Sequence, residues 1–421
     1  MRRAIAPVIA VVAMAVSLRC ETAWAGGLTE TLPRNTFLLD LSFYTSQLSY
    51  AYDDDGELRP LFDEIPRYEP GGGLQGTIIP DVDVGFGILV PQLQYGILDE
   101  LSVGIGIPVV LYTEIEPRLS WIPGDYQWTL GRAFTEQDFW EWAESMGQPR
   151  PGRVTTNRGV LADMVLGVRY RFTDDIPALR RAGLAAALTL MGSLPTGEEA
   201  DPEEVVTAGT TSWDLHSQGE LCVHLSVEEA FQGALDGRLT IGLDFFYEAF
   251  FRHEYTTPRG ERNPLLLTYQ PYVGDTYTLD PGDFLGATVQ VEGVPYRGPA
   301  RATWLVGRDP ERARALPPIL TLSARYTFTY VYQSDWESDS ELWDWARERT
   351  WRPGYKNILA FGLSVSFLRL GAPLSVYVRY RNQTWIGGRN TRAANVWTFG
   401  LQVPFQIWGR RGRSEEEEER E

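Results

Sequence analysis

The chain has little of the chemistry that most enzymes and metal-binding proteins use. Its 421 residues include two cysteines and three histidines, and Cys222 is the only cysteine beyond residue 25. A single cysteine excludes an internal disulfide and a thiolate metal cluster in that part of the chain. No later stretch approaches the roughly 18 uninterrupted apolar residues of a transmembrane helix. The motifs G-x-S-x-G and H-E-x-x-H are absent too, so we expect neither a catalytic site, nor a metal, nor a cofactor.

The first 25 residues predict a secretion signal. Arg2 and Arg3 form a positive start, residues 4–16 form a short apolar run, and Ala23-Trp24-Ala25 is a small-x-small cleavage site. A lipoprotein anchored through Cys20 is disfavoured, because Leu18 and Arg19 precede it where small residues are required. We therefore expect export and cleavage after Ala25.

The rest of the chain is acidic and uniform in composition. The formal net charge of −18 argues against nucleic acid as a partner. No composition shift marks a domain boundary, so we predict one body over residues 26–408. Residues 409–421, with five consecutive acids at 415–419, are expected to form a charged, disordered tail.

Eleven segments alternate between an apolar row and a polar row. The last is typical: Trp397, Phe399, Leu401, Val403 and Phe405 are separated by polar or small residues. A period of two places the rows on opposite faces of a β-strand, and an uncharged apolar face of this length suits lipid. The sequence predicts an all-β, antiparallel, up-and-down transmembrane barrel. In its second strand we assign Val82, Val84, Phe86, Ile88 and Val90 to the lipid face.

The connections have the asymmetry of such barrels. They are short at 97–100, 173–181 and 369–373, and long at 53–75, 113–158, 197–211 and 334–354. With both termini on one side, parity requires a further strand between residues 254 and 316, for which we choose Phe284–Tyr296. The total is then about 12 strands, with 10 or 14 as open alternatives. We expect short helices in the external loops.

Charged residues on the polar rows predict a lumen that discriminates between solutes. The predicted lumenal set is Asp81, Asp83, Asp163, Arg169, Arg171, Asp244, Glu248, Arg325, Arg379 and Arg381. One interpretation is a selectivity ring. The other is a salt-bridge network that keeps like charges apart inside a narrow tube. Both hold if the network lies at a constriction.

Two loop segments carry paired tryptophans: Trp140 and Trp142 within 135–146, and Trp343 and Trp345 within 339–349. Thr135 followed by Asp138 predicts a helix N-cap for the first segment. The four rings either pack against loops and the barrel rim or form an aromatic lid for an apolar ligand.

A barrel-borne hydrolase is a further hypothesis. It needs a serine beside a histidine and an acid that orients the histidine. Ser226 follows His224 by two residues and shares its row, but no orienting acid is evident from the sequence. Catalysis is therefore the weakest of the alternatives.

Two stretches resemble the family of outer-membrane transporters associated with the meta-pathway of phenol degradation. They are QYGILDELSVGIGIPVVL at 94–111 and the hairpin at 161–197, which runs from LADMVLGVRYRF to LPTG. The resemblance implies a channel-type barrel for small aromatic or apolar compounds, and it offers no catalytic residues.

These observations predict a monomeric channel in the outer membrane of a Gram-negative cell. Its expected partners are membrane lipid, lipopolysaccharide, the barrel assembly machinery and a small solute. The alternative from another class is a barrel without transport, whose external loops bind a partner or surface.

Overall fold

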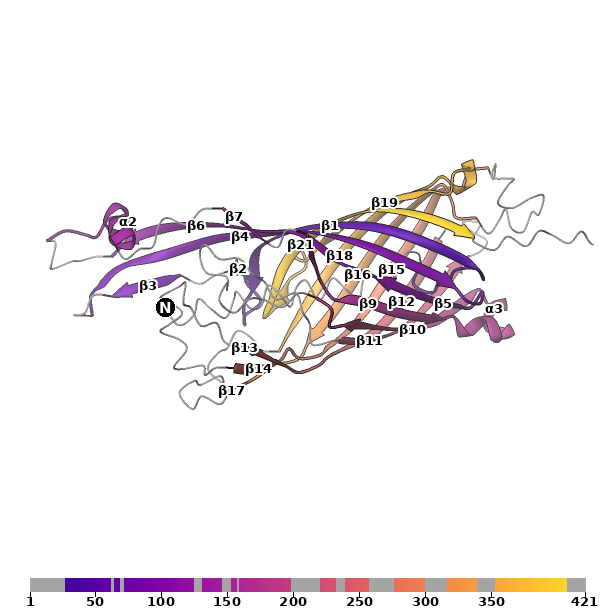
Figure 1. Ribbon diagram of the computed structural model, residues 1–421, viewed down its shortest axis with the longest axis horizontal. Coiled ribbons are helices and arrows are strands. Elements are labelled where there is room, and N and C mark those ends of the chain that lie inside the picture. The colour runs from indigo at the N-terminus through magenta and orange to yellow at the C-terminus, as the bar shows by residue number, and fades with distance from the viewer. Residues whose placement is uncertain are drawn as a thin grey trace, which may run out of the picture.

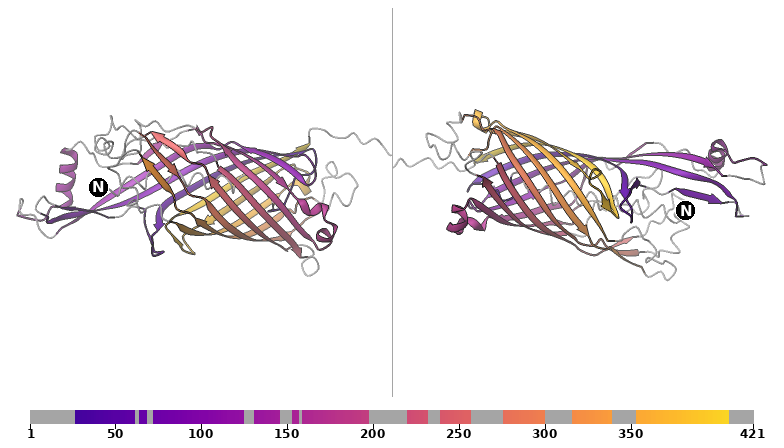
Figure 2. Two further views of the ribbon diagram at one scale, coloured as in Figure 1. Left: turned by 90° about the horizontal axis from the view of Figure 1, so that it is seen from below. Right: turned by 180° about the vertical axis from the view of Figure 1, so that it is seen from behind.

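The computed structural model describes residues 27–61, 64–68, 72–124, 131–145, 153–156, 159–197, 220–231, 239–256, 276–299, 316–338 and 353–406. The predicted leader, the predicted tail, Trp343 and Trp345 lie outside these residues. Within them, 12 antiparallel strand units, which we call staves, close into a barrel. Figures 1 and 2 show the tilt of the strands around the barrel. The predicted all-β fold class is confirmed.

The staves follow one another in chain order. They are β1 (Thr36–Tyr52), β4 (Leu74–Gly96), β5 (Leu101–Gly106) continued by β6 (Val109–Pro123), β9 (Met164–Tyr170), β10 (Leu184–Leu194), β11 (Glu220–Phe231), β12 (Leu239–Phe250), β15 (Phe284–Tyr296), β16 (Leu320–Val331), β18 (Gly354–Ser366), β19 (Ser375–Asn382) and β21 (Thr391–Gln406). Each stave pairs with the next, and β1 pairs with both β4 and β21, which closes the ring. The strand predicted at Phe284–Tyr296 is β15 and is confirmed.

Most apolar rows face outward as predicted. On β12, Leu243 is 44% exposed and Phe245 is 55% exposed, whereas Asp244, between them, is 5% exposed. Directly paired residues share a face of the sheet, so the pairing of Leu225 with Phe245 continues the outer surface onto β11. The outside of the barrel is therefore an apolar, uncharged belt of the kind that contacts hydrocarbon.

The assignment of faces on β4 is wrong and is corrected here. Ile88 pairs with Tyr44, which is buried, and Leu89 pairs with the outward Phe43. Val84, Phe86, Ile88 and Val90 are accordingly 2–6% exposed and face the lumen. Alternation separates two rows but does not say which one meets lipid, and β4 has an apolar row on its inner side.

One stave breaks where Pro108 removes a backbone donor from the ladder. Before the break, β5 pairs with β4 and β9; after it, β6 pairs with β4, β7 (Val154–Thr156) and β8 (Val160–Leu161). Ala162 N donates to Pro108 O over 2.9 Å, so the chain entering β9 covers the break.

The two ends of the barrel differ, and we name them by their connections. The short-turn end carries residues 97–100, the pair η1 (Phe172–Asp175) and α3 (Pro177–Arg181), and η4 (Leu368–Leu370). The long-loop end carries β2 (Leu58–Pro60), β20 (Gly388–Arg389) and a small sheet of β13 (His253–Thr256), β14 (Thr276–Asp280) and β17 (Asp335–Ser338). No helix in the described ranges has the length and apolar character needed to cross a membrane.

An arm projects from the long-loop end (Figure 1). It consists of the far halves of β4 and β6, which pair as far as Gly76 and Pro123, with β3 (Ile65–Tyr68) along one edge. The helix α2 (Glu136–Ser145) packs on it, and Phe139 stacks on Trp121 with ring centroids 4.8 Å apart. The arm thus has its own small aromatic core, made of Trp121, Phe134, Phe139, Trp140 and Ala143.

The N-terminus of α2 is capped as predicted. Thr135 N and Thr135 Oγ1 donate to Asp138 Oδ2 over 2.8 and 2.7 Å, and the backbone N of Asp138 returns a bond to Thr135 Oγ1. Arg132 pairs with the same carboxylate. Arg132 and the Thr135 donors hold the pKa of Asp138 well below its ordinary value of 3.8.

This depressed pKa predicts acid lability of α2. A carboxylate with a lowered folded pKa stabilises fully above its unfolded value, and the stabilisation is lost as pH falls through the folded value. After correction for the intrinsic pH dependence of amide exchange, we expect lower hydrogen–deuterium protection factors in residues 131–145 below about pH 4 than at pH 7. Asp138→Asn should show fast exchange already at pH 7, and Glu144→Gln, at the exposed far end, should not. Equal exchange in all three proteins would contradict the cap.

Candidate functional site

The segment before β1 lies inside the barrel, across its short-turn end. Leu28 N and Thr29 N donate to the Glu228 carboxylate over 2.6 and 3.1 Å, and Thr29 Oγ1 donates to it as well. Arg169 Nη1 donates to the carbonyls of Gly27 and Glu30, both over 3.1 Å. These partners belong to β11 and β9, so the segment spans the inner face of several staves.

The far end of the same segment is fixed to the neighbouring part of the wall, since Ser102 on β5 pairs with Arg169 on β9. Leu32 N donates to Ser102 Oγ over 2.8 Å, and Thr31 Oγ1 donates to Asp99 O over 2.7 Å. The inward face of Gly242 leaves room for Leu28, because a Cβ there would lie 2.7 Å from Leu28 Cδ1. We call residues 27–33 the inner segment; they restrict the cross-section of the lumen.

The inner segment borders a cavity of about 70 Å³ in the lumen, which Gly27 and Leu28 help to line. Five of the predicted lumenal residues line it together: Arg169, Asp244, Glu248, Arg325 and Arg379. The β-strand period brings them to one surface from four different staves, β9, β12, β16 and β19. Sequence reasoning placed these five residues in the lumen, and the structure adds that they share one cavity.

Two of the arginines are oriented by neutral partners. Arg325 Nε and Nη2 donate to Gln290 Oε1 over 3.1 and 2.6 Å. The Arg379 guanidinium lies 4.8 Å from the centre of the Tyr377 ring. Neither contact neutralises the positive charge, so both guanidinium groups contribute positive potential to the cavity.

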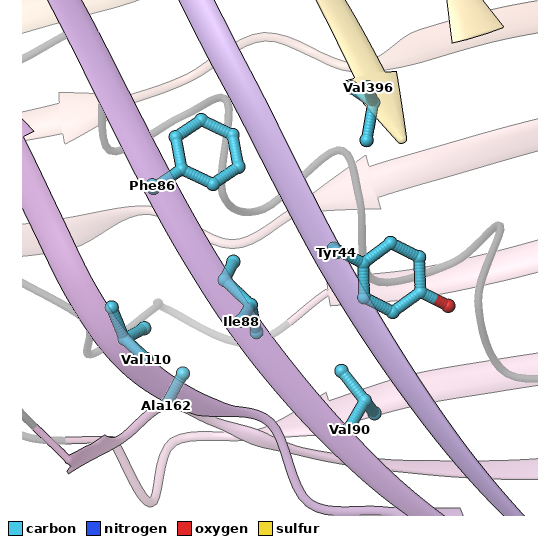
Figure 3. Close-up of a cluster of buried hydrophobic side chains, with 7 residues drawn as sticks. All are labelled: Tyr44, Phe86, Ile88, Val90, Val110, Ala162 and Val396. Carbon is cyan, nitrogen blue, oxygen red and sulfur yellow. The ribbon is translucent and has the colours of Figure 1, made fainter. Parts of the chain in front are cut away.

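An apolar wall faces this charged region from β1, β4, β6, β21 and the link between β8 and β9. It consists of Tyr44, Phe86, Ile88, Val90, Val110, Ala162 and Val396. Figure 3 shows these side chains projecting from neighbouring strands toward one another. Val396 pairs with Ser46, which continues the wall around the seam between the last strand and the first. We refer to this set as the apolar wall.

The seam itself is polar on the inside. Asp40 accepts hydrogen bonds from Ser42 Oγ over 2.5 Å, from Tyr377 Oη over 3.1 Å and from Gln402 Nε2 over 2.8 Å. The side chains come from β1, β19 and β21, so one buried carboxylate connects the first strand to the last two.

Several predicted lumenal residues lie elsewhere. Asp81 and Asp83 are on the outer face of β4, where Arg118 lies 3.6 and 2.6 Å from them. Their placement in the lumen is corrected for the same reason as the rest of the β4 rows. Asp163 is fully buried and accepts from the backbone N of Thr196 and of Gly197 over 2.9 and 2.6 Å.

Two further arginines complete the predicted set. Arg171 Nη2 donates to Asp99 O over 3.3 Å at the short-turn end. Arg381 follows Arg379 by two residues on β19 and therefore shares its inward row.

The described half of the predicted aromatic lid is corrected too. Trp140 is 6% exposed in the core of the arm, and the Arg67 guanidinium lies 3.4 Å from the centre of the Trp142 ring. Figure 1 places α2 at the end of the arm, away from the barrel. The length of the β4–β6 hairpin, which loop composition does not reveal, carries both rings away from the lumen.

A group that sequence reasoning missed lies on β11 and β12. His224 Nδ1 is 3.0 Å from Asp244 Oδ2, and His224 Nε2 is 3.1 Å from Cys222 Sγ. Ser226 Oγ donates to Asp244 Oδ1 over 2.7 Å and does not contact His224. The Ser–His pair of the hydrolase hypothesis therefore does not form. In the described part of the chain, no three His, Cys, Asp or Glu side chains converge as metal ligands.

Comparison with known proteins supports the fold. No family model matches the chain, and no curated protein sequence matches it. Among solved structures, an outer membrane channel from Pseudomonas putida F1 is 10% identical with a TM-score of 0.51, covering 91% of this chain and 100% of that one. At this identity the similarity shows the fold alone, which is that of outer-membrane β-barrels.

Two further structures are less similar. The translocator domain of the autotransporter NalP from Neisseria meningitidis is 9% identical with a TM-score of 0.41, over 96% of this chain and 100% of that one. The Ralstonia pickettii toluene transporter TbuX is 8% identical with a TM-score of 0.32, over 89% and 90%. The resemblance to transporters of the phenol meta-pathway stays a prediction.

Proposed function

We propose that the protein is an outer-membrane channel for a small solute with an apolar or aromatic part. The observation that carries the proposal is the apolar wall inside the barrel. Lumenal rows of membrane barrels are usually polar, because they face water. The side chains of the wall are 1–6% exposed and pack on one another, so a solute that passes has to part them and replace their contacts. Each Å² of apolar solute surface that is buried there gains roughly 25 cal/mol. A solute with a ring or alkyl group therefore gains contact energy that a sugar or an inorganic ion does not.

The charged cavity gives the other half of the proposed selectivity. Arg169, Arg325 and Arg379 share it with Asp244 and Glu248. Fixed charges of both signs at a constriction favour solutes whose polar groups match them. We infer that the preferred solute has an apolar body and one polar or anionic group.

The proposal includes a location and an orientation. The chain is exported by its leader, inserted by the barrel assembly machinery, and surrounded by lipid and lipopolysaccharide as a monomer. The short-turn end faces the periplasm, and the long-loop end with the arm faces outward. This orientation follows the usual asymmetry of outer-membrane barrels, which have short periplasmic turns and longer external loops.

The apolar wall predicts selective block of ion current. In planar bilayers, benzoate should reduce the current at roughly tenfold lower concentration than acetate, because only benzoate has a ring to bury. The double variant Phe86→Ser with Ile88→Ser should lose most of this difference. Current recordings over a range of both anions measure it.

Leu89→Ser is the matched control, since Leu89 neighbours Ile88 and points outward. It should leave the benzoate block unchanged. Heat-resistant migration in gels confirms that each variant is a folded barrel. Equal block by benzoate in the double variant and the parent would remove the apolar wall from the solute path.

The second candidate function is a barrel that binds a partner or surface and transports nothing. The arm favours it, because it projects from the barrel and has its own aromatic core. A barrel that stays electrically silent, even after removal of the inner segment, would favour this second function.

A further inference from the structure

Cys222, His224 and Asp244 have the spatial order of a nucleophile, a base and an orienting acid. Cys222 and His224 are two residues apart on β11, and Asp244 is on β12, where it pairs with Ser226. The sulfur-to-Nε2 distance is 3.1 Å and the Nδ1-to-Oδ2 distance is 3.0 Å. Nucleophilic sites in unrelated folds are recognised by this chain of two hydrogen bonds.

The imidazole is held in one orientation. Asp244 binds it through Oδ2 and is itself fixed through Oδ1 by Ser226 Oγ at 2.7 Å. The Phe246 ring stacks beside the His224 ring with centroids 5.4 Å apart. Since Nδ1 is engaged by the carboxylate, Nε2 is directed at the sulfur, which is the geometry needed to take the thiol proton.

The group lies beside a cavity and near positive charge. Cys222, His224 and Asp244 line the cavity described above, together with Arg169, Arg325, Arg379 and Lys356. Cations next to a thiol favour the thiolate, which is the reactive form. Cys222 itself is 0% exposed, so a small molecule in this cavity reaches the sulfur when the side chains around it move apart.

We propose that Cys222 is a nucleophilic site in the lumen that captures small α,β-unsaturated carbonyl compounds. His224 takes the thiol proton, and the sulfur forms a C–S bond to the β-carbon of the ligand. The electron pair of the C=C π bond moves to give an enolate, whose α-carbon then takes the proton from His224. The net change is addition of S–H across C=C, with nothing oxidised or reduced. The proposal is independent of conduction.

The test uses N-ethylmaleimide, an α,β-unsaturated imide, on the purified barrel in detergent at pH 7. Intact mass gives the rate of adduct formation, and peptide mass mapping assigns the adduct to Cys222. We expect alkylation at least about tenfold faster than in a control with Cys222→Ser and Thr329→Cys. Thr329 lines the same cavity from β16, so its replacement offers a thiol of equal access without the imidazole.

Variants of the other two residues separate chemistry from packing. His224→Gln and Asp244→Asn should each slow alkylation roughly tenfold in the folded barrel. In denaturant, all thiols should react at the same rate. If His224→Gln does not fold, Ser226→Ala tests the same series of hydrogen bonds. It removes the Ser226 Oγ bond to the Asp244 carboxylate, and it should also slow the alkylation. Parent and control rates that agree in the folded state would overturn the proposal, as would a parent rate unchanged by His224→Gln.

Discussion

A chain that lacks residues 27–33 should conduct at least about threefold more current per channel than the full chain. The inner segment lies along the inner wall at the short-turn end, over the neighbouring staves from Ser102 on β5 to Glu228 on β11, and takes up part of the lumen. Pore conductance follows the open cross-section at the narrowest point, so removing the obstruction widens the path. Single-channel recording in planar bilayers measures the change.

A milder variant tests the same contact without a deletion. The Glu228 carboxylate accepts from Leu28 N, Thr29 N and Thr29 Oγ1, and charge-assisted bonds of this kind are about twice as strong as neutral ones. Glu228→Gln keeps the shape and removes the charge, so the inner segment should leave the wall more often and the current should fluctuate between two levels.

Glu229→Gln is the control for this experiment. Glu229 is the next residue of β11, is exposed and belongs to the opposite face. It removes the same charge without touching the inner segment, so the recordings should match those of the parent. A deletion variant with parental conductance would show that the obstruction lies elsewhere in the lumen.

Leu243→Arg should destabilise the membrane-inserted barrel by about 2–4 kcal/mol, the cost of a cation at the lipid midplane. Leu243 is 44% exposed near the middle of β12, on the outward row with Phe245. Leu239→Arg, on the same row at the end of the strand, should cost only about 0–1 kcal/mol. Urea unfolding in lipid vesicles gives both free energies of unfolding.

Comparing Leu243, near the membrane midplane, with Leu239, near the membrane surface, makes the experiment specific for contact with lipid. A soluble β-protein whose apolar row packs on a second layer would lose stability according to packing, without regard to a membrane midplane. If Leu239→Arg cost as much as Leu243→Arg, lipid would not be the contact of the outer belt.

Strand positions were predictable because every residue on the face that contacts lipid has to be apolar and uncharged. The uncharged row of β12 and the pattern at Phe284–Tyr296 both follow from this requirement, and both strands are confirmed. The cap of α2 was predictable as well, since Thr135 and Asp138 act locally.

Contacts that depend on register were not predictable. Which face of β4 points into the lumen depends on which of its two rows pairs with Tyr44 on β1. The sequence of β4 alone does not determine this pairing. The orienting acid of His224 is 20 residues away and reaches it only because Ser226 pairs with Asp244. The inner segment has no strand periodicity, and its partners are long-range. Trp140 follows the β4–β6 hairpin, whose length beyond the barrel depends on pairing as well.

The seam closed by the buried Asp40 carboxylate also protects the chain from aggregating with other copies of itself. Asp40 connects β1 to β19 and β21 through its side chain. At the same seam, β1 pairs with β21, which satisfies the backbone donors and acceptors along both terminal strands. An unpaired strand edge is a template for intermolecular addition. A nascent chain that has not yet delivered residues 391–406 would present two such edges, one on β1 and one on β19. Protection against aggregation therefore arrives with the last strand to be made.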